Sequence, residues 1–219
     1  MARVSGADDE KRIAAEAAAE LVEDGMTVGL GTGSTVAHLL PAIAARGLSG
    51  IRCVATSVAT EEQARDLGIP VEEFSELQRL DIAIDGTDQV TPDGWLIKGG
   101  GGAHLREKIV AAAAERFVVI ADSSKPVEVL TAPVPLELFA FGLRSTLARL
   151  GPEVELRDAP RSPDSGVIAD YSGEIGDPAT LAANLEADHG IAAHGLFPPD
   201  MVSAVLVGTG GTVERLTLP

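Results

Sequence analysis

The chain has 219 residues, of which 45% are hydrophobic and 23% are charged, and its formal net charge is −16. This length permits one large domain, or a main domain with a smaller companion. The acidic balance argues against a general nucleic-acid binder, which needs a basic stripe. A small anion can still be bound locally, because a few backbone N–H groups and one or two lysines suffice.

The sequence shows no membrane-spanning segment and no secretory signal. No apolar run approaches the roughly 20 residues that cross a bilayer. The first residues, MARVSGADDEKR, lack the apolar core of a secretory signal. Cys53 is the only cysteine, so no intrachain disulfide can form, which suits a reducing cytoplasm. We therefore expect a cytoplasmic protein without membrane or nucleic-acid partners.

Helix and strand patterns alternate in the first half of the chain. Ser5 and Asp8 have the spacing of a capping box, and the Ala-rich amphipathic helix that follows is expected to stop at Gly25. Strands are predicted at 27–30, 51–55, 80–84 and 117–121, and helices at 36–46, 60–67 and 105–115. Alternation of this kind indicates a parallel sheet covered on both faces.

The pattern changes after Lys125. A helix is predicted at 143–150, strands at 154–157 and 167–171, and a further helix from Asp177-Pro178 to about residue 188. This sequence of short strands and helices predicts a small α+β domain inserted near residue 131. The apolar stretch 201–207 is expected to return to the first sheet. We thus predict an α/β domain formed by residues 1–130 and 202–219, and a small α+β domain formed by residues 131–201.

A glycine-rich turn, GTGST at 31–35, separates the first predicted strand from the next helix. Its glycines would let the backbone approach an anion, and Ser34 and Thr35 would add hydroxyls at a helix N-terminus. A tight turn with an N-cap serine is an equally open alternative. The motif is not a P-loop, because no Gly-Lys-Ser/Thr follows, and GLGTGS does not complete a dinucleotide fingerprint. A nicotinamide enzyme is therefore disfavoured.

Two carboxylates, Asp85 and Asp88, flank Gly86 and Thr87 after the strand predicted at 80–84. Ligands bind beyond the carboxyl ends of strands in open parallel sheets, which favours a functional role. An Asx-type turn is the alternative. The two carboxylates would also suit a divalent metal, but no histidine pairs with them in the sequence, so no metal site is predicted.

Lys98 opens a run of four glycines at 99–102. Glycine carries a large entropy cost, so such a run implies that the backbone has a task that side chains would block. Successive N–H groups beside a lysine can stabilise developing negative charge. A mobile surface loop is the alternative, but it would more often include Ser, Asn or Asp.

Two charged residues complete the set of candidates. Glu107 shares a helical face with Ala103 and Val110, and on that face it would be half-buried and aimed at the glycine run. Leu105, Ile109 and Ala112 form a competing apolar line, so the helical spacing leaves both faces open. A glutamate that merely complements the helix dipole is the alternative. Lys125 follows an apolar strand at the same predicted edge of the sheet, although most lysines in such positions are surface charges.

Taken together, GTGST, DGTD, KGGGGAHLREK and ADSSK, in this order and spacing, resemble ribose-5-phosphate isomerase of type A. PVPLEL, SGVIADY, HGLF and VGTGG extend the resemblance over essentially the whole chain. The resemblance implies a Rossmann-like α/β catalytic domain with a smaller inserted α+β domain, assembled as a homodimer or homotetramer. It also implies interconversion of D-ribose 5-phosphate and D-ribulose 5-phosphate in the non-oxidative pentose phosphate pathway, without a metal or an organic cofactor.

The resemblance also assigns roles by position. It implies Glu107 as the proton acceptor, with Asp85 and Lys98 as further catalytic residues. The substrate-binding residues that it implies are Thr32, Gly33, Ser34, Thr35, Asp85, Gly86, Thr87, Asp88, Lys98, Gly99, Gly100, Gly101 and Lys125. Ser34, Thr35 and Lys125 would lie near the phosphate, and Lys11 is a looser candidate. The chain departs from the family pattern at Gln89, where an acid is usual, and at Gly102 and His104, where Ala and Leu are common.

The chemistry agrees with these roles. One carboxylate on a rigid helix can take a proton from C2 and return it at C1, while Lys98 and the glycine N–H groups would stabilise the enediolate. Asp85 is expected to assist opening of the furanose ring. Two alternatives belong to other classes. One is a regulatory domain that senses a sugar phosphate. Such a domain would normally follow a DNA-binding module, and the segment before Thr27 leaves no room for one. The other is a related enzyme, an amino-sugar phosphate deaminase or a CoA transferase.

Overall fold

The structure is a computed structural model that describes residues 6–218, so Ser5 of the expected capping box lies outside the described residues. A six-stranded sheet forms the larger part, in the order β13-β12-β6-β3-β1-β2. Its strands are β1 (Thr27–Leu30), β2 (Arg52–Ala55), β3 (Leu80–Gly86), β6 (Ala114–Asp122), β12 (Ala204–Thr209) and β13 (Thr212–Leu216). All neighbours are parallel except β12 and β13. The predicted parallel sheet and the return of the last apolar stretch to it are confirmed.

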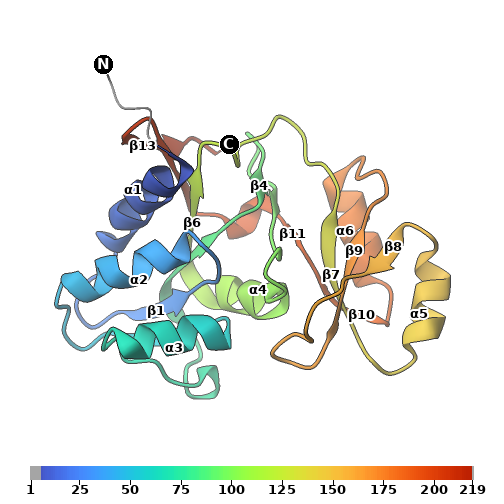
Figure 1. The fold of residues 1–219 in the computed structure, drawn as a ribbon, viewed down its shortest axis with the longest axis horizontal. Coiled ribbons are helices and arrows are strands. Elements are labelled where there is room, and N and C mark those ends of the chain that lie inside the picture. The colour runs from blue at the N-terminus through green and yellow to red at the C-terminus, as the bar shows by residue number, and fades with distance from the viewer. Residues whose placement is uncertain (1–5, 219) are drawn as a thin grey trace.

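Helices cover both faces of this sheet (Figure 1). They are α1 (Ala7–Ala19), α2 (Val36–Ala45), α3 (Val58–Asp66) and α4 (His104–Ala113). Successive side chains of β3 point to opposite faces. Ile82 and Ile84 pack in the core that includes α1 and α2, whereas Ala83 packs with Val110 of α4. Because both faces are buried, the strands read as continuous apolar runs.

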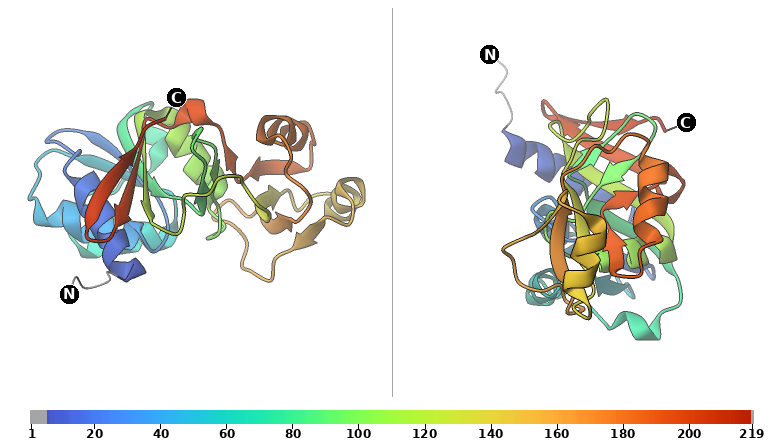
Figure 2. Two further views of the ribbon diagram at one scale, coloured as in Figure 1. Left: turned by 90° about the horizontal axis from the view of Figure 1, so that it is seen from above. Right: turned by 90° about the vertical axis from the view of Figure 1, so that its right-hand side faces the viewer.

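A second, four-stranded antiparallel sheet forms the lobe drawn mainly in yellow and orange in Figures 1 and 2. It contains β7 (Val134–Leu138), β8 (Val154–Leu156), β9 (Val167–Tyr171) and β10 (Ile191–His194), with α5 (Leu143–Leu150) and α6 (Pro178–Glu186). Its own core includes Leu136, Leu138, Ala169 and Leu185. The α/β fold with a smaller α+β part agrees with the expectation. Domain boundaries at residues 131 and 201 stay a prediction.

The two lobes meet around α4 and a small third sheet. This sheet has the order β11-β5-β4 and is formed by β4 (Gln89–Val90), β5 (Leu96–Ile97) and β11 (Leu196–Phe197). Helix α4 contacts β3 and β6 on one side and β7 and β10 on the other. Residues that leave β3, β5 and α4 are therefore brought to one place between the lobes.

Several boundaries differ from the sequence-based expectation. Helix α4 ends at Ala113 and β6 begins at Ala114, where the helix was expected to continue to 115 and the strand to begin at 117. Ala114 pairs with Leu80 of β3, so sheet pairing overrides the helix propensity of alanine. Helix α1 ends at Ala19 instead of continuing to Gly25, and the Arg46 guanidinium donates to the Ala19 and Val22 carbonyls.

Two short 3-10 turns complete the architecture, η1 (Phe74–Glu76) and η2 (Pro199–Met201). The second of these occupies the start of the stretch predicted as strand 201–207, so β12 begins only at Ala204. Within residues 6–218, no helix is both long enough and apolar enough to span a bilayer.

Candidate active site

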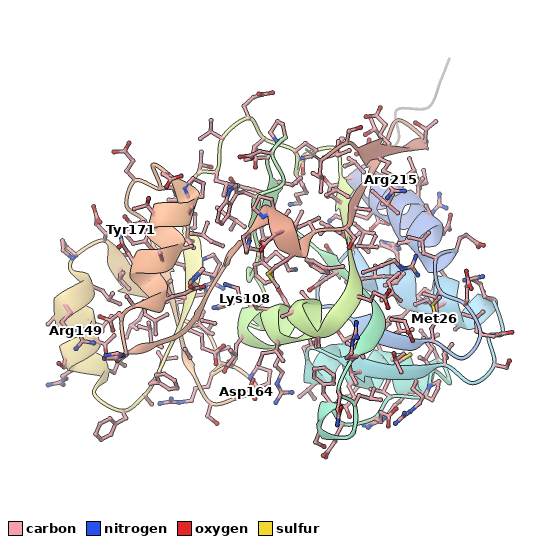
Figure 3. The ribbon with its side chains drawn as sticks, turned by 180° about the vertical axis from the view of Figure 1, so that it is seen from behind. Met26, Lys108, Arg149, Asp164, Tyr171 and Arg215 are labelled. Carbon is pink, nitrogen blue, oxygen red and sulfur yellow. The ribbon has the colours of Figure 1, made fainter. Side chains whose placement is uncertain are left out.

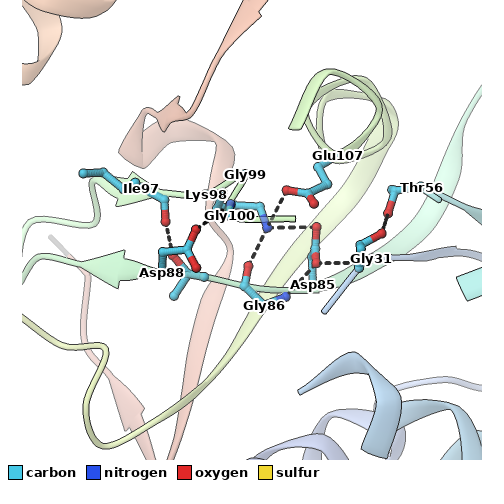
Figure 4. A network of polar contacts seen from close by, with 12 residues as sticks. Gly31, Thr56, Asp85, Gly86, Asp88, Ile97, Lys98, Gly99, Gly100 and Glu107 are labelled. Atoms are coloured by element: carbon cyan, nitrogen blue, oxygen red, sulfur yellow. Dashed lines mark hydrogen bonds and ion pairs between the residues drawn. The ribbon is translucent and has the colours of Figure 1, made fainter. Parts of the chain in front are cut away.

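Three charged side chains meet between the lobes (Figure 4). The Lys98 ammonium lies 2.9 Å from Asp85 Oδ2 and 3.1 Å from Glu107 Oε2, and it also donates to the Gly86 carbonyl. None of the three side chains is more than 4% exposed, so water barely screens the ion pairs. Burial lowers the pKa of Lys98, but the two carboxylates raise it further, so the net shift is upward and the ammonium stays charged.

Asp85 is held in place by backbone groups from the turn after β1 and from the end of β3. Its Oδ1 accepts hydrogen bonds from the N–H of Thr32, at 3.0 Å, and from the N–H of Gly86, at 2.7 Å. Gly31 is required beside it, because a Cβ at this position would lie 2.0 Å from the Asp85 carboxyl carbon. The first glycine of GTGST thus serves the close approach of the turn to Asp85.

Glu107 lies on the buried face of α4 together with Val110, and it is fully buried where half-burial was expected. Glu107, Val110 and Ala111 are buried, whereas Ile109 on the competing apolar line is 50% exposed. Burial raises the pKa of the Glu107 carboxyl to about 7; the Asp85 charge adds to this and the Lys98 ammonium opposes it. A carboxylate that titrates near neutrality can both accept and return a proton at physiological pH.

The glycine run forms a tight loop between β5 and α4. Gly99 and Gly102 have φ of 101° and 72°, which other residues rarely adopt. The Gly100 N–H donates to Asp88 Oδ2 at 2.9 Å (Figure 4). The Thr87 hydroxyl donates to the Ile97 carbonyl at 2.9 Å, which ties the DGTD turn to the start of the loop. The acidic turn and the glycine loop are therefore one connected unit.

GTGST forms the turn from β1 into α2, and its Gly33 has φ of 122°. The helix N-cap is Thr35, whose side chain makes no capping hydrogen bond, so the alternative of an N-cap serine is wrong. The N-terminus of α2 remains open toward the site and favours an anion. The Thr32 hydroxyl lies 2.7 Å from that of Thr56, which follows β2.

These segments enclose a pocket of about 120 Å³. It is lined by Thr32, Gly33, Ser34, Thr35, Gly86, Thr87, Asp88, Lys98, Gly99, Gly100, Gly101, Glu107 and Lys125. Of the residues expected from the sequence, only Asp85 is not at the pocket wall, because it lies behind Lys98. The looser candidate, Lys11, is not among the lining residues. The pocket joins two carboxylates, two lysines and an open helix N-terminus, which suits proton transfer on a small anionic molecule.

The departures from the family pattern have local explanations. The Gln89 amide both donates to the Thr131 carbonyl and accepts from the Thr131 N–H, each at 2.8 Å. A carboxylate could not make the first of these bonds. His104 is fully buried behind the loop, where a Cβ on Gly99 would lie 2.7 Å from its Nδ1. Burial and the Lys108 charge lower the pKa of His104 to about 3, so it is neutral and supports the loop from behind instead of contacting the pocket.

Two residues near the site were missed in the sequence. The ring of Phe197 on β11 lies 5.5 Å from the Lys98 ammonium, at a distance typical of a cation–π contact. The Arg157 guanidinium, just after β8, donates to the Gly100 carbonyl at 2.9 Å. Neither residue belongs to a glycine-rich or acidic motif. Only the pairing of distant strands brings them to the site.

Across residues 6–218, no group of three or more His, Cys, Asp or Glu side chains is arranged to hold a metal ion. The two aspartates of the DGTD turn both have partners in the protein. Asp85 pairs with Lys98, and Asp88 accepts a hydrogen bond from the loop backbone. The Lys98 ammonium is a buried cation that contacts both Asp85 and Glu107.

Comparison with known proteins gives a consistent result. Residues 52–211 match the family model of ribose 5-phosphate isomerase A (phosphoriboisomerase A). A relative from Caulobacter vibrioides, ribose-5-phosphate isomerase A, is 49% identical over 96% of this chain and 98% of its own length.

Solved structures show the same similarity. Ribose 5 phosphate isomerase A from Neisseria gonorrhoeae superposes with a TM-score of 0.94 and 35% identity, covering 99% of this chain and all of that one. A D-ribose-5-phosphate isomerase solved in complex with phospho-erythronic acid has a TM-score of 0.90 and 33% identity, over 97% of this chain and 99% of that one.

Proposed function

The chain belongs to the ribose-5-phosphate isomerase A family and is an aldose–ketose isomerase, and we propose that it interconverts D-ribose 5-phosphate and D-ribulose 5-phosphate in the non-oxidative pentose phosphate pathway. One observation carries this proposal. The Glu107 carboxylate is buried, lies 3.1 Å from the Lys98 ammonium, and faces a pocket that also contains an open helix N-terminus. Each part of the substrate has a complementary group there.

Glu107 transfers the proton. Its carboxylate removes the proton from C2 of the open-chain aldose. The electron pair of that C–H bond forms the C1–C2 double bond, and the π pair of the carbonyl moves onto O1 to give an enediolate. Lys98 and the glycine-loop N–H groups stabilise the negative charge on oxygen. The hydroxyl proton on O2 passes to O1, and the protonated Glu107 delivers its proton to C1 as C2–O2 becomes the carbonyl of the ketose. The raised pKa of Glu107, about 7, suits both halves of this exchange.

The rest of the pocket binds and orients the substrate. Ser34, Thr35 and Lys125 hold the phosphate, with the N-terminal N–H groups of α2. The sugar hydroxyls lie along two segments: Gly86, Thr87 and Asp88 on one side, and Lys98, Gly99, Gly100 and Gly101 on the other, with Thr32 and Gly33 closing the pocket. Asp85 is not at the pocket wall, and it acts on the sugar through the Lys98 ammonium, 2.9 Å away. Asp85, fixed by Thr32 and Gly86, assists opening of the furanose ring.

Assembly and location form a further part of the proposal. We expect a homodimer or homotetramer in the cytoplasm that needs no metal or organic cofactor. Support for assembly comes from the loop before α5, where Phe139 and Phe141 are 51% and 96% exposed. Aromatic side chains this exposed are typical of protein contact surfaces.

A coupled assay of ribose 5-phosphate conversion, run with excess chelator, tests the function. We expect the native protein to produce ribulose 5-phosphate under these conditions. Glu107→Gln should lower kcat by about 10²–10⁴-fold, the range that general acid–base catalysis contributes. Phospho-erythronic acid should still bind to the variant in calorimetry, because the phosphate contacts are unchanged.

Glu115→Gln is the matched control, because this exposed glutamate lies just beyond the same helix, in β6. It should retain native kcat. Near-native activity of Glu107→Gln would remove Glu107 from the mechanism. A native protein that ignores ribose 5-phosphate but deaminates an amino-sugar phosphate, or transfers CoA, would overturn the proposed reaction.

A further inference from the structure

The smaller lobe sends one charged side chain to the glycine loop. Arg157 follows β8, and its guanidinium donates to the carbonyls of Gly100, at 2.9 Å, and Gly99, at 3.3 Å. The loop also packs directly on this lobe, because a Cβ at Gly102 would lie 3.4 Å from Ile168 of β9. The pocket lining found among the described residues includes none from β8 or β9, so this lobe reaches the pocket through the loop.

Arg157 is itself held rigidly. Its Nε donates to Asp170 Oδ2 at 2.9 Å and its Nη2 donates to Asp170 Oδ1, so the two side chains form a two-point ion pair. Such a pair fixes the plane of the guanidinium as well as its position. Asp170 lies in the middle of the sheet pairing, opposite Pro135 of β7 and Glu155 of β8.

Peptide geometry carries this constraint into the pocket. In a planar trans peptide, the carbonyl of one residue and the N–H of the next point in opposite directions. Arg157 holds the carbonyl of Gly99, and the Gly100 N–H on the other side of that peptide donates to Asp88. It likewise holds the carbonyl of Gly100, which directs the Gly101 N–H away from Arg157, and Gly101 lines the pocket.

We propose that Arg157, fixed by Asp170, is a positioning residue that sets the orientation of the Gly99–Gly100–Gly101 peptides for stabilisation of the reacting oxygen. The inference rests on the proposed isomerase function. It assigns to the smaller lobe a part in catalysis exerted through the loop backbone. Because N–H donors act most strongly on the charge that develops in the transition state, loss of this support lowers kcat more than it changes KM.

Arg157→Met tests the proposal, with Arg149→Met as a matched control. Arg149 also forms a two-point pair with an aspartate, Asp188, at 2.7 and 3.0 Å. It lies on α5, at the end of the molecule remote from the six-stranded sheet (Figure 3). We expect Arg157→Met to lower kcat by about 10–100-fold, the scale of a misplaced catalytic group, with KM within about threefold of native, and Arg149→Met to leave both unchanged.

Hydrogen exchange provides a readout that does not depend on the reaction. The N–H groups of Gly100 and Gly102 are bonded to Asp88 and to the Gly99 carbonyl, so a peptide covering 98–103 should exchange faster in Arg157→Met than in the native protein or in Arg149→Met. If the native protein fails to isomerise ribose 5-phosphate, the proposed function fails, while this comparison still decides whether Arg157 orders the loop.

Two results would overturn the proposal. One is a kcat of Arg157→Met within about twofold of native, and the other is an equal fall in kcat for Arg149→Met. If Arg157→Met does not fold, Arg157→Lys decides on the same readouts. An ammonium keeps the charge but cannot pair at two points with Asp170 and also hold both carbonyls. A lower kcat with faster loop exchange supports the proposal, and native values for both overturn it.

Discussion

Glu107 is subject to opposing influences that together place its pKa near neutrality. Burial and the Asp85 charge raise the pKa, and the Lys98 ammonium, 3.1 Å away, holds it down. The net shift is upward, to about 7, so in the folded protein the carboxyl group is mostly protonated below this pH and mostly ionised above it. Only the ionised form can accept the C2 proton.

Activity should therefore rise with pH through about 7 and level off above it. At one unit below the pKa, kcat/KM should be about tenfold lower than its plateau, because about one enzyme molecule in ten then carries the ionised form. The measurement is the pH profile of kcat/KM, with the coupling enzymes checked at each pH by adding ribulose 5-phosphate.

Asp85→Asn provides the matched comparison for this profile. Removing the negative charge beside Glu107 lowers the pKa of Glu107, so the acidic limb of the profile should move to lower pH, whatever the loss in absolute rate. A native profile with its limb at the ordinary pKa of a glutamate would contradict the account of Glu107.

Single residues were predictable from the sequence where a motif constrains the backbone. Helical spacing aligns Glu107 with Val110, but it aligns Leu105, Ile109 and Ala112 with one another equally well, so the spacing alone did not decide which face is buried. Arg157 could not be predicted, because its neighbours, RDAPRS, form no motif and its partners, Gly100 and Asp170, are far away in the chain. Charge alone does not distinguish it from the exposed arginines.

At the scale of elements, the turn between β1 and α2 has to pass close to β3. Gly31 permits this approach, since a Cβ there would lie 2.0 Å from Oδ1 of Asp85 and 2.5 Å from its Cβ. The carboxylate cannot move aside without losing its bonds to the N–H groups of Thr32 and Gly86.

Gly31→Ala should consequently impair both stability and activity. We expect a loss of about 1–3 kcal/mol in the free energy of unfolding, the usual cost of overpacking, together with a lower kcat because Asp85 is displaced. Urea unfolding and the coupled assay measure these effects. Gly6→Ala is the control, because no atom lies within 4 Å of the added Cβ. Equal behaviour of the two variants would show that the turn tolerates the displacement.

Helix α5 was predicted with its observed bounds, and the strand predicted at 117–121 forms the central part of β6. The two-residue strands β4, β5 and β11 were not, because such short segments show no periodicity. Strand β7 was missed because it contains Pro135, which cannot donate to a neighbouring strand. In the structure, its carbonyl accepts from the N–H of Gly195 instead, at 2.7 Å.

At the scale of the whole molecule, the candidate site joins segments that the chain order separates. The six-stranded sheet brings Asp85 to the carboxyl end of β3, next to GTGST after β1, as expected for a parallel sheet. The contribution of the smaller lobe through Arg157, and that of the third sheet through Phe197, depend on how the segments around β8 and β11 dock against the site. Docking of this kind is fixed by tertiary packing and leaves no local signal.

The net charge of −16 also has meaning only at this scale. An anionic substrate meets a strongly acidic molecule, yet the pocket presents Lys98, Lys125 and the N-terminus of α2. Recognition is therefore local, and the surplus acid lies outside the pocket, where it favours solubility.

In the proposed reaction, a protein carboxylate moves a proton between C2 and C1. Turnover of ribose 5-phosphate in D₂O, followed by NMR of the products, distinguishes this route from a direct transfer of the hydrogen. Because Glu107 faces an open pocket, its acquired proton can exchange with solvent, so deuterium should appear at C1 of ribulose 5-phosphate and, on the return reaction, at C2 of ribose 5-phosphate. Complete retention of the original hydrogen after many turnovers would contradict the account, since a direct hydride shift would then explain the reaction.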